Sequence, residues 1–71
     1  MRAWLKSLRE NSGLSQSAIA EKLGITQNYY CEIERGEKMK NLPLPFALKL
    51  CEILGVDLDF VCRMESAANE S

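Results

Sequence analysis

Three observations predict that this chain folds into an all-α domain of five short helices. Apolar residues recur every three or four positions along five separate intervals, the spacing that places side chains on one face of a helix. Each of the four glycines follows the end of such an interval, where glycine commonly terminates a helix. No interval alternates apolar and polar residues in the manner of a β-strand. A chain of 71 residues is long enough for one small domain.

The first helix is expected over Arg2–Ser12. Its apolar stripe is formed by Met1, Leu5 and Leu8, and Trp4 beside them is expected to be a partly buried packing residue. Gly13 ends this helix.

Two further helices, Ser15–Leu23 and Thr26–Arg35, are joined by a tight turn. Ser15 and Thr26 are good N-caps, because a hydroxyl oxygen can accept a hydrogen bond from an amide in the first turn. Gly24 permits the positive φ that a sharp turn after a helix commonly requires. The residues expected to face inward are Ile19, Ala20, Leu23, Tyr30 and Ile33. The whole stretch is typical of a helix-turn-helix.

The outward side of the second of these helices is polar. Its residues at i, i+1, i+4, i+5 and i+8 are Gln27, Asn28, Cys31, Glu32 and Arg35. Gln and Asn can each make two hydrogen bonds to the edge of adenine, and Glu can accept one from cytosine N4 while repelling phosphate. Arg35, Lys38 and Lys40 follow, where positive charge would meet the flanking DNA backbone.

The remaining chain is predicted to hold a loop, two helices and a tail. Residues 37–44 are loop-like, and a fourth helix begins near Pro45 and ends at Leu54. Asp57 caps a short fifth helix. We therefore expect a domain over residues 1–64 and a polar, flexible tail over residues 65–71.

Charge is distributed unevenly. The net charge is −1, which by itself argues against a nucleic-acid partner. Residues 1–40, however, hold seven Lys and Arg against five Asp and Glu, whereas residues 41–71 hold two against five. Such asymmetry orients a protein on a DNA duplex and predicts salt-sensitive binding.

Other classes of function are disfavoured. No apolar run is long enough to span a membrane and the N-terminus is no signal peptide, so we expect a cytoplasmic protein. There are three cysteines without C-x-x-C spacing and no histidine, so we expect neither a metal site nor a cofactor. No set of acid, base and nucleophile can be assembled, so we expect no enzyme activity.

Five motifs together make the chain resemble the DNA-binding domain of the phage repressor and Cro family, also called the Xre family. They are L-x-x-L-R at 5–9, G-L-S-Q at 13–16, I-A-x-x-L-G-I at 19–25, I-E-R-G at 33–36 and K-L-x-x-x-L-G-V at 49–56. The resemblance implies a compact five-helix, lambda-repressor-like fold. It also implies sequence-specific binding to operator DNA, commonly by two-fold dimers that repress transcription.

The resemblance also implies roles for individual residues. Gln16 matches a phosphate contact that steadies the first base-reading residue, and Gln27, Asn28 and Glu32 match base-reading positions, with the helix 26–35 in the major groove. Tyr29 matches a position near the DNA backbone, and Arg35 matches a phosphate contact. Arg9 and Glu34 match an ion pair that joins the first and third helices. Two positions depart from the family pattern: Tyr30 replaces an aliphatic residue, and Leu44 replaces a Ser-type cap.

One reading helix covers few base pairs, so we expect a homodimer on a palindromic operator. The expected contact is the C-terminal half, with the apolar residues Phe46, Ile53, Phe60 and Met64. The alternative is a protein-interaction module of the same fold, antitoxin-like or an antirepressor. The observations that motivate the alternative are the acidic C-terminal half and the apolar Met39, Leu42, Phe46 and Ile53.

Overall fold

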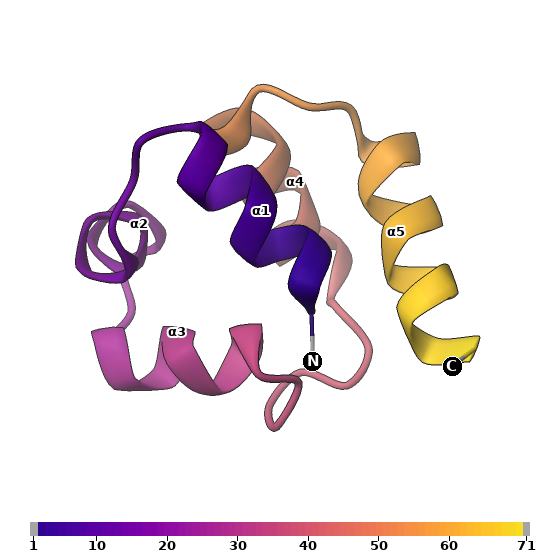
Figure 1. Ribbon diagram of the computed structural model, residues 1–71, viewed down its shortest axis with the longest axis horizontal. Helices are drawn as coiled ribbons and strands as arrows, with labels where there is room; N and C mark the ends of the chain where they lie inside the picture. Colours follow the sequence, from indigo (N-terminus) through magenta and orange to yellow (C-terminus); the bar gives the residue numbers. More distant parts are fainter. Residues whose placement is uncertain (1, 71) are drawn as a thin grey trace.

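Five α-helices follow one another in the computed structural model, which describes residues 2–70 (Figure 1). They are α1 (Ala3–Asn11), α2 (Gln16–Leu23), α3 (Gln27–Glu34), α4 (Leu44–Leu54) and α5 (Leu58–Glu70). No β-strand occurs between residues 2 and 70. The prediction of an all-α domain of five helices is confirmed.

The helices begin where the sequence provides caps. The three predicted cap side chains each accept a hydrogen bond from an amide in the first turn: Ser15 from Ala18 at 3.0 Å, Thr26 from Tyr29 at 3.1 Å and Asp57 from Phe60 at 2.8 Å. Helix α4 has no side-chain cap, and it begins at Leu44, with Pro43 at the cap position and Pro45 in its first turn. A proline fits there because the first-turn amides have no partner inside the helix.

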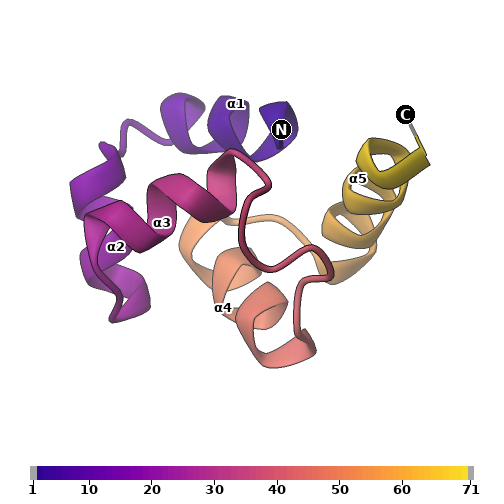
Figure 2. The ribbon, with the colours of Figure 1, turned by 90° about the horizontal axis from the view of Figure 1, so that it is seen from below.

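A left-handed residue turns the chain between α2 and α3. Gly24 has φ +73°, and the amide of Ile25 bonds back to the carbonyl of Ala20 at 3.0 Å. As a result α2 and α3 cross steeply; α2 is viewed almost end-on in Figure 1 while α3 lies across the page. Figures 1 and 2 both place α2 and α5 at opposite ends of the molecule, with α1, α3 and α4 between them.

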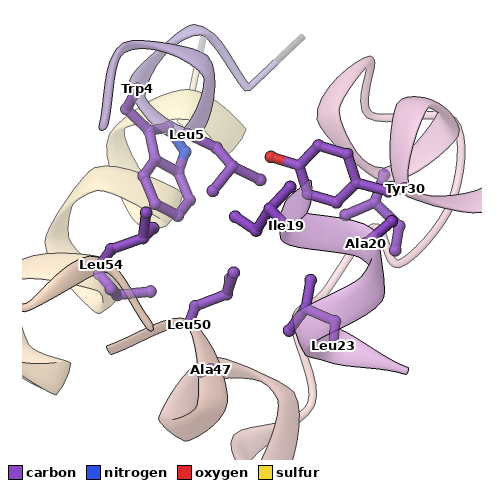
Figure 3. Close-up of a cluster of buried hydrophobic side chains, with 11 residues drawn as sticks. Trp4, Leu5, Ile19, Ala20, Leu23, Tyr30, Ala47, Leu50 and Leu54 are labelled. Atoms are coloured by element: carbon purple, nitrogen blue, oxygen red, sulfur yellow. The ribbon is translucent and has the colours of Figure 1, made fainter. Parts of the chain in front are cut away.

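The core lies where α1, α2, α3 and α4 converge, and α5 covers one side of it. Its buried apolar residues are Trp4, Leu5, Ile19, Ala20, Leu23, Tyr30, Ile33, Ala47, Leu50, Leu54 and Val61. In Figure 3 the Tyr30 ring enters this cluster beside Ile19, with its hydroxyl directed toward Leu5. The inward positions expected for α2 and α3 are therefore confirmed.

Helix α5 is longer than the sequence suggested. Residues 65–71 were expected to form a polar tail outside the domain, but the helix continues to Glu70. Glu65 is 9% exposed and forms an ion pair with Arg2 at 2.7 Å. That contact fastens the second half of α5 to the start of the chain, which no apolar periodicity in this segment indicated. Ser71 lies outside the described residues, and so does Met1, which was expected in the apolar stripe of the first helix.

Gly24→Ala should lower the free energy of unfolding by about 1 kcal/mol, because alanine is disfavoured at positive φ. A Cβ at Gly24 would meet nothing within 4 Å, and the same holds at Gly55, where φ is +70°. Gly55→Ala is therefore a matched control that should cost a similar amount in chemical denaturation. If Gly24→Ala were stabilising, the left-handed turn between α2 and α3 would be wrong, since alanine stabilises only where φ is compatible.

Candidate nucleic-acid interface

Helix α3 has one buried and one accessible face. Tyr30, Ile33 and Glu34 are buried. Gln27 and Asn28 are exposed in the first turn, and Tyr29, Cys31 and Glu32 are partly exposed. Because 3.6 residues make one turn, Asn28, Glu32 and Arg35 follow one another along the accessible side. The side chains capable of hydrogen bonding to bases thus share one accessible surface.

Gln16, the first residue of α2, is held against α3 by two contacts. Its Nε2 donates to Glu34 Oε1 at 3.4 Å, and its Oε1 accepts from Cys31 Sγ at 3.1 Å. These contacts fix the plane of the amide at the edge of the α3 surface. The sequence placed Cys31 on the outward side of this helix and indicated no role for it, and the structure adds its contact with Gln16.

The Arg9–Glu34 pair predicted from the family resemblance is present and buried. Arg9 Nε and Nη2 lie 2.9 and 3.3 Å from the two carboxylate oxygens of Glu34, and Arg9 Nη1 donates to the carbonyl of Leu14 at 2.9 Å. The two side chains are 9% and 4% exposed. The pair therefore ties the C-terminal ends of α1 and α3 together.

Electrostatics favours the ionised pair. Burial alone would raise the pKa of Glu34, but the hydrogen bond from Arg9, the neighbouring Tyr30 and the charge of Arg9 hold that pKa below its usual value. Burial, followed by the adjacent Glu34 carboxylate, raises the pKa of the Tyr30 phenol. Tyr30 accordingly stays neutral beside a carboxylate that stays charged.

Two of the predicted cationic contacts lie at the C-terminal end of α3. Arg35 forms an exposed ion pair with Glu37 at 3.2 Å. Pairs this exposed contribute little to stability, so the guanidinium can exchange Glu37 for another anion. Lys38 is exposed, while its backbone carbonyl accepts from Arg2 Nη1 at 3.1 Å.

Arg2 and Glu65 form the arrangement that sequence reasoning missed. Arg2 is 4% exposed, and its guanidinium bonds both carboxylate oxygens of Glu65 and three backbone carbonyls near the end of α3. The two residues are 63 positions apart in sequence. Considered separately, each is typical of a charged residue at a protein surface. No local signal identifies such a pair.

The chain matches a family model described as helix-turn-helix over residues 5–61. It belongs to the helix-turn-helix family. It is also 32% identical over 65 residues to a Bacillus subtilis (strain 168) protein named "Uncharacterized HTH-type transcriptional regulator YgzD", with 92% of this chain and 96% of that protein covered. The recognised lambda-repressor-like (Xre) resemblance is thereby confirmed, and the chain is a member of a family of DNA-binding transcription regulators.

Regulators of the helix-turn-helix family are typically not enzymes. Within residues 2–70, no helix is long and apolar enough to cross a membrane. Nor does this part of the chain hold a group of three or more His, Cys, Asp or Glu side chains able to bind a metal ion. Cys31, Cys51 and Cys62 are free thiols.

Removing one member of the Arg9–Glu34 pair should cost about 3–5 kcal/mol of unfolding free energy, because it leaves a buried charge without a partner. Thermal and denaturant unfolding of Arg9→Met, Glu34→Gln and the double variant would measure this. The double variant should lose less than the sum of the two single losses. Small, additive losses of unfolding free energy in the three variants would contradict the buried pair.

Because the pKa of Glu34 is lowered on folding, wild-type stability should also fall as the pH drops from about 5 to 3, and less steeply in Glu34→Gln.

Proposed function

We propose that this chain is a sequence-specific, double-stranded-DNA-binding repressor of transcription that places α3 in the major groove. The observation that carries the proposal is the division of α3 into a core face, held by Tyr30, Ile33 and the Arg9–Glu34 pair, and an accessible face with Gln27 and Asn28 at its N-terminal end. A rigid helix presenting amides at its exposed first turn matches the way recognition helices present base-reading side chains. Repression would follow from occupying an operator in the cytoplasm.

The proposed base contacts come from three side chains. Gln27 and Asn28 present amides that can pair with the N6 and N7 edge of adenine. Glu32, one turn further along, can accept from cytosine N4 and disfavours other bases by repulsion.

The proposed backbone contacts surround those three side chains. Gln16 approaches a phosphate from α2, Tyr29 from the first turn of α3, and Arg35 and Lys38 from the segment after it. Contacts of this kind fix the position of a protein on the duplex without reading sequence. These roles are supported by the partial exposure of Gln16 and Tyr29 and by the exposure of Lys38.

Asn28→Ala should cost about 1–3 kcal/mol on a preferred site and much less on random DNA, because only base contacts depend on sequence. Arg35→Ala should weaken binding to both and make the salt slope shallower by about one unit. The preferred site would first be selected from random duplexes, and affinities would then be measured by titration at several salt concentrations. If Asn28→Ala weakened both DNAs equally, Asn28 would be a backbone contact, and the proposed reading would be wrong.

We further propose that two copies bind a palindromic operator through their C-terminal halves. Among the described residues, the most exposed large apolar side chains are Leu44 at 58%, Leu48 at 48% and Phe60 at 39%. Phe46, Ile53 and Met64, also expected at this contact, are only partly exposed and pack against the core. The centre of the proposed contact therefore moves to Leu44 and Leu48 at the start of α4, with Phe60 on α5.

Leu48→Ser should shift the chain toward monomer and lower affinity for a two-half-site duplex more than for a single half-site. The reason is that burying one leucine contributes about 1.5–3 kcal/mol. Lys49→Ser, also exposed on α4, is the matched control and should leave the assembly unchanged. Sedimentation with and without the duplex would measure both variants. A one-to-one wild-type complex with full specificity would refute the dimer.

The exposed Leu44 and Leu48 also support the second candidate, a protein-interaction module of the antitoxin-like or antirepressor kind. That function would make α4, rather than α3, the working surface. The Asn28→Ala titration distinguishes the two candidate functions. A protein-binding module would bind no preferred DNA sequence, so Asn28→Ala could not reduce a preference for one.

A further inference from the structure

A buried guanidinium lies between the N-terminus, the end of α3 and the second half of α5. Arg2 Nη1 donates to the carbonyl of Ile33 at 2.6 Å and to that of Lys38 at 3.1 Å, and Nη2 donates to the carbonyl of Met39. Arg2 Nε lies 2.9 and 3.0 Å from the two oxygens of Glu65, and Nη2 lies 2.7 Å from one of them. A single side chain thus joins three segments that are distant in sequence.

The contacts of Arg2 fix the backbone that follows α3. Ile33 is in the last turn of α3, where carbonyls lack partners inside the helix and a positive charge is favourable. Met39 has φ +53°, a conformation that residues with a Cβ seldom adopt. A hydrogen bond from Arg2 to the Met39 carbonyl helps to offset the cost of that conformation. The route of the loop therefore depends on Arg2.

Glu65 is the group that allows Arg2 to remain buried. A charged guanidinium out of water requires a counter-charge and partners for its N–H groups. Glu65 supplies the charge from α5, and the three carbonyls supply the remaining acceptors. The position of α5 and the path of the loop are thereby linked.

We propose that Arg2, held by Glu65, is a positioning residue for DNA binding, which sets the backbone of residues 35–40 so that Arg35, Lys38 and Lys40 meet phosphates in one fixed arrangement. The inference rests on the proposed function. At 4% exposure Arg2 does not itself reach DNA. A loop that is already ordered before binding loses less conformational entropy when its side chains contact phosphates.

Two charge-matched variants of α5 separate positioning from general electrostatics. Glu65→Gln and Asp59→Asn each remove one negative charge from the same helix. Asp59 forms an exposed pair with Arg63 at 2.8 Å, with side chains 69% and 78% exposed. Electrostatics alone would make both variants bind DNA slightly more tightly. If Glu65 instead positions Arg2, Glu65→Gln should bind DNA more weakly than the wild-type chain, and Asp59→Asn should not.

The experiment titrates a duplex selected with the wild-type chain at several salt concentrations. We expect Glu65→Gln to raise the Kd about 3- to 10-fold and to make the salt slope shallower by about one to two units, as the loss of one or two phosphate contacts would. Asp59→Asn should match wild type or bind slightly more tightly. Hydrogen exchange should show the Lys38 amide, bonded to the Glu32 carbonyl at 3.3 Å, losing protection in Glu65→Gln while α2 amides keep theirs.

Equal affinity and slope for the two folded variants would overturn the inference. So would a weaker Glu65→Gln with the wild-type slope, since the loss would then not involve phosphates. Should Glu65→Gln fail to fold, Arg2→Lys replaces it. A lysine keeps the charge opposite Glu65 but cannot reach three carbonyls, so the same loss of affinity and slope is expected. A wild-type chain that selects no duplex would instead refute the proposed function itself.

Discussion

The accessible surface of α3 depends on the buried ion pair between Arg9 and Glu34. Glu34 is at the C-terminal end of α3, and its carboxylate is bonded by Arg9 from α1 and by Gln16 from α2. Three helices therefore meet at one charged group. A rotation of α3 about its axis would separate buried opposite charges, which is expensive in a medium of low dielectric constant. That constraint fixes which residues of α3 face outward.

A second buried pair, Arg2–Glu65, performs the corresponding task for the segment that follows α3. The first pair fixes the helix, and the second holds the segment that follows it. Between them they determine the placement of both kinds of side chain proposed to contact DNA, those that read bases and those that contact phosphate. Leu44 and Leu48, the exposed leucines of α4, take part in neither ion pair. The proposed dimer contact and the proposed base contacts can therefore occupy separate surfaces of this small domain.

Much of the fold was predictable because its determinants are local. Ser15, Thr26 and Asp57 cap helices within three residues of themselves, and Gly24 turns the chain through its own φ. The accessible positions of α3 followed from helical periodicity, whereas the Arg9–Glu34 pair followed from family resemblance alone. The Cys31–Gln16 contact, the buried Arg2 and the extension of α5 were not predictable, because each joins residues distant in sequence whose types are ordinary at a surface. Contact with DNA at Gln16, Gln27, Asn28, Tyr29, Glu32, Arg35 and Lys38 stays a prediction.

The most direct test of the central claim is to map, by NMR, which backbone amides shift when a selected duplex is added to the wild-type chain. If the two buried pairs present α3 and the following loop to DNA, the largest changes should fall on residue 16, residues 27–32 and residues 35–40. Amides of the buried core, such as those of Ile19 and Leu50, should change little. Unchanged amides throughout residues 27–32 in the bound state would contradict the account.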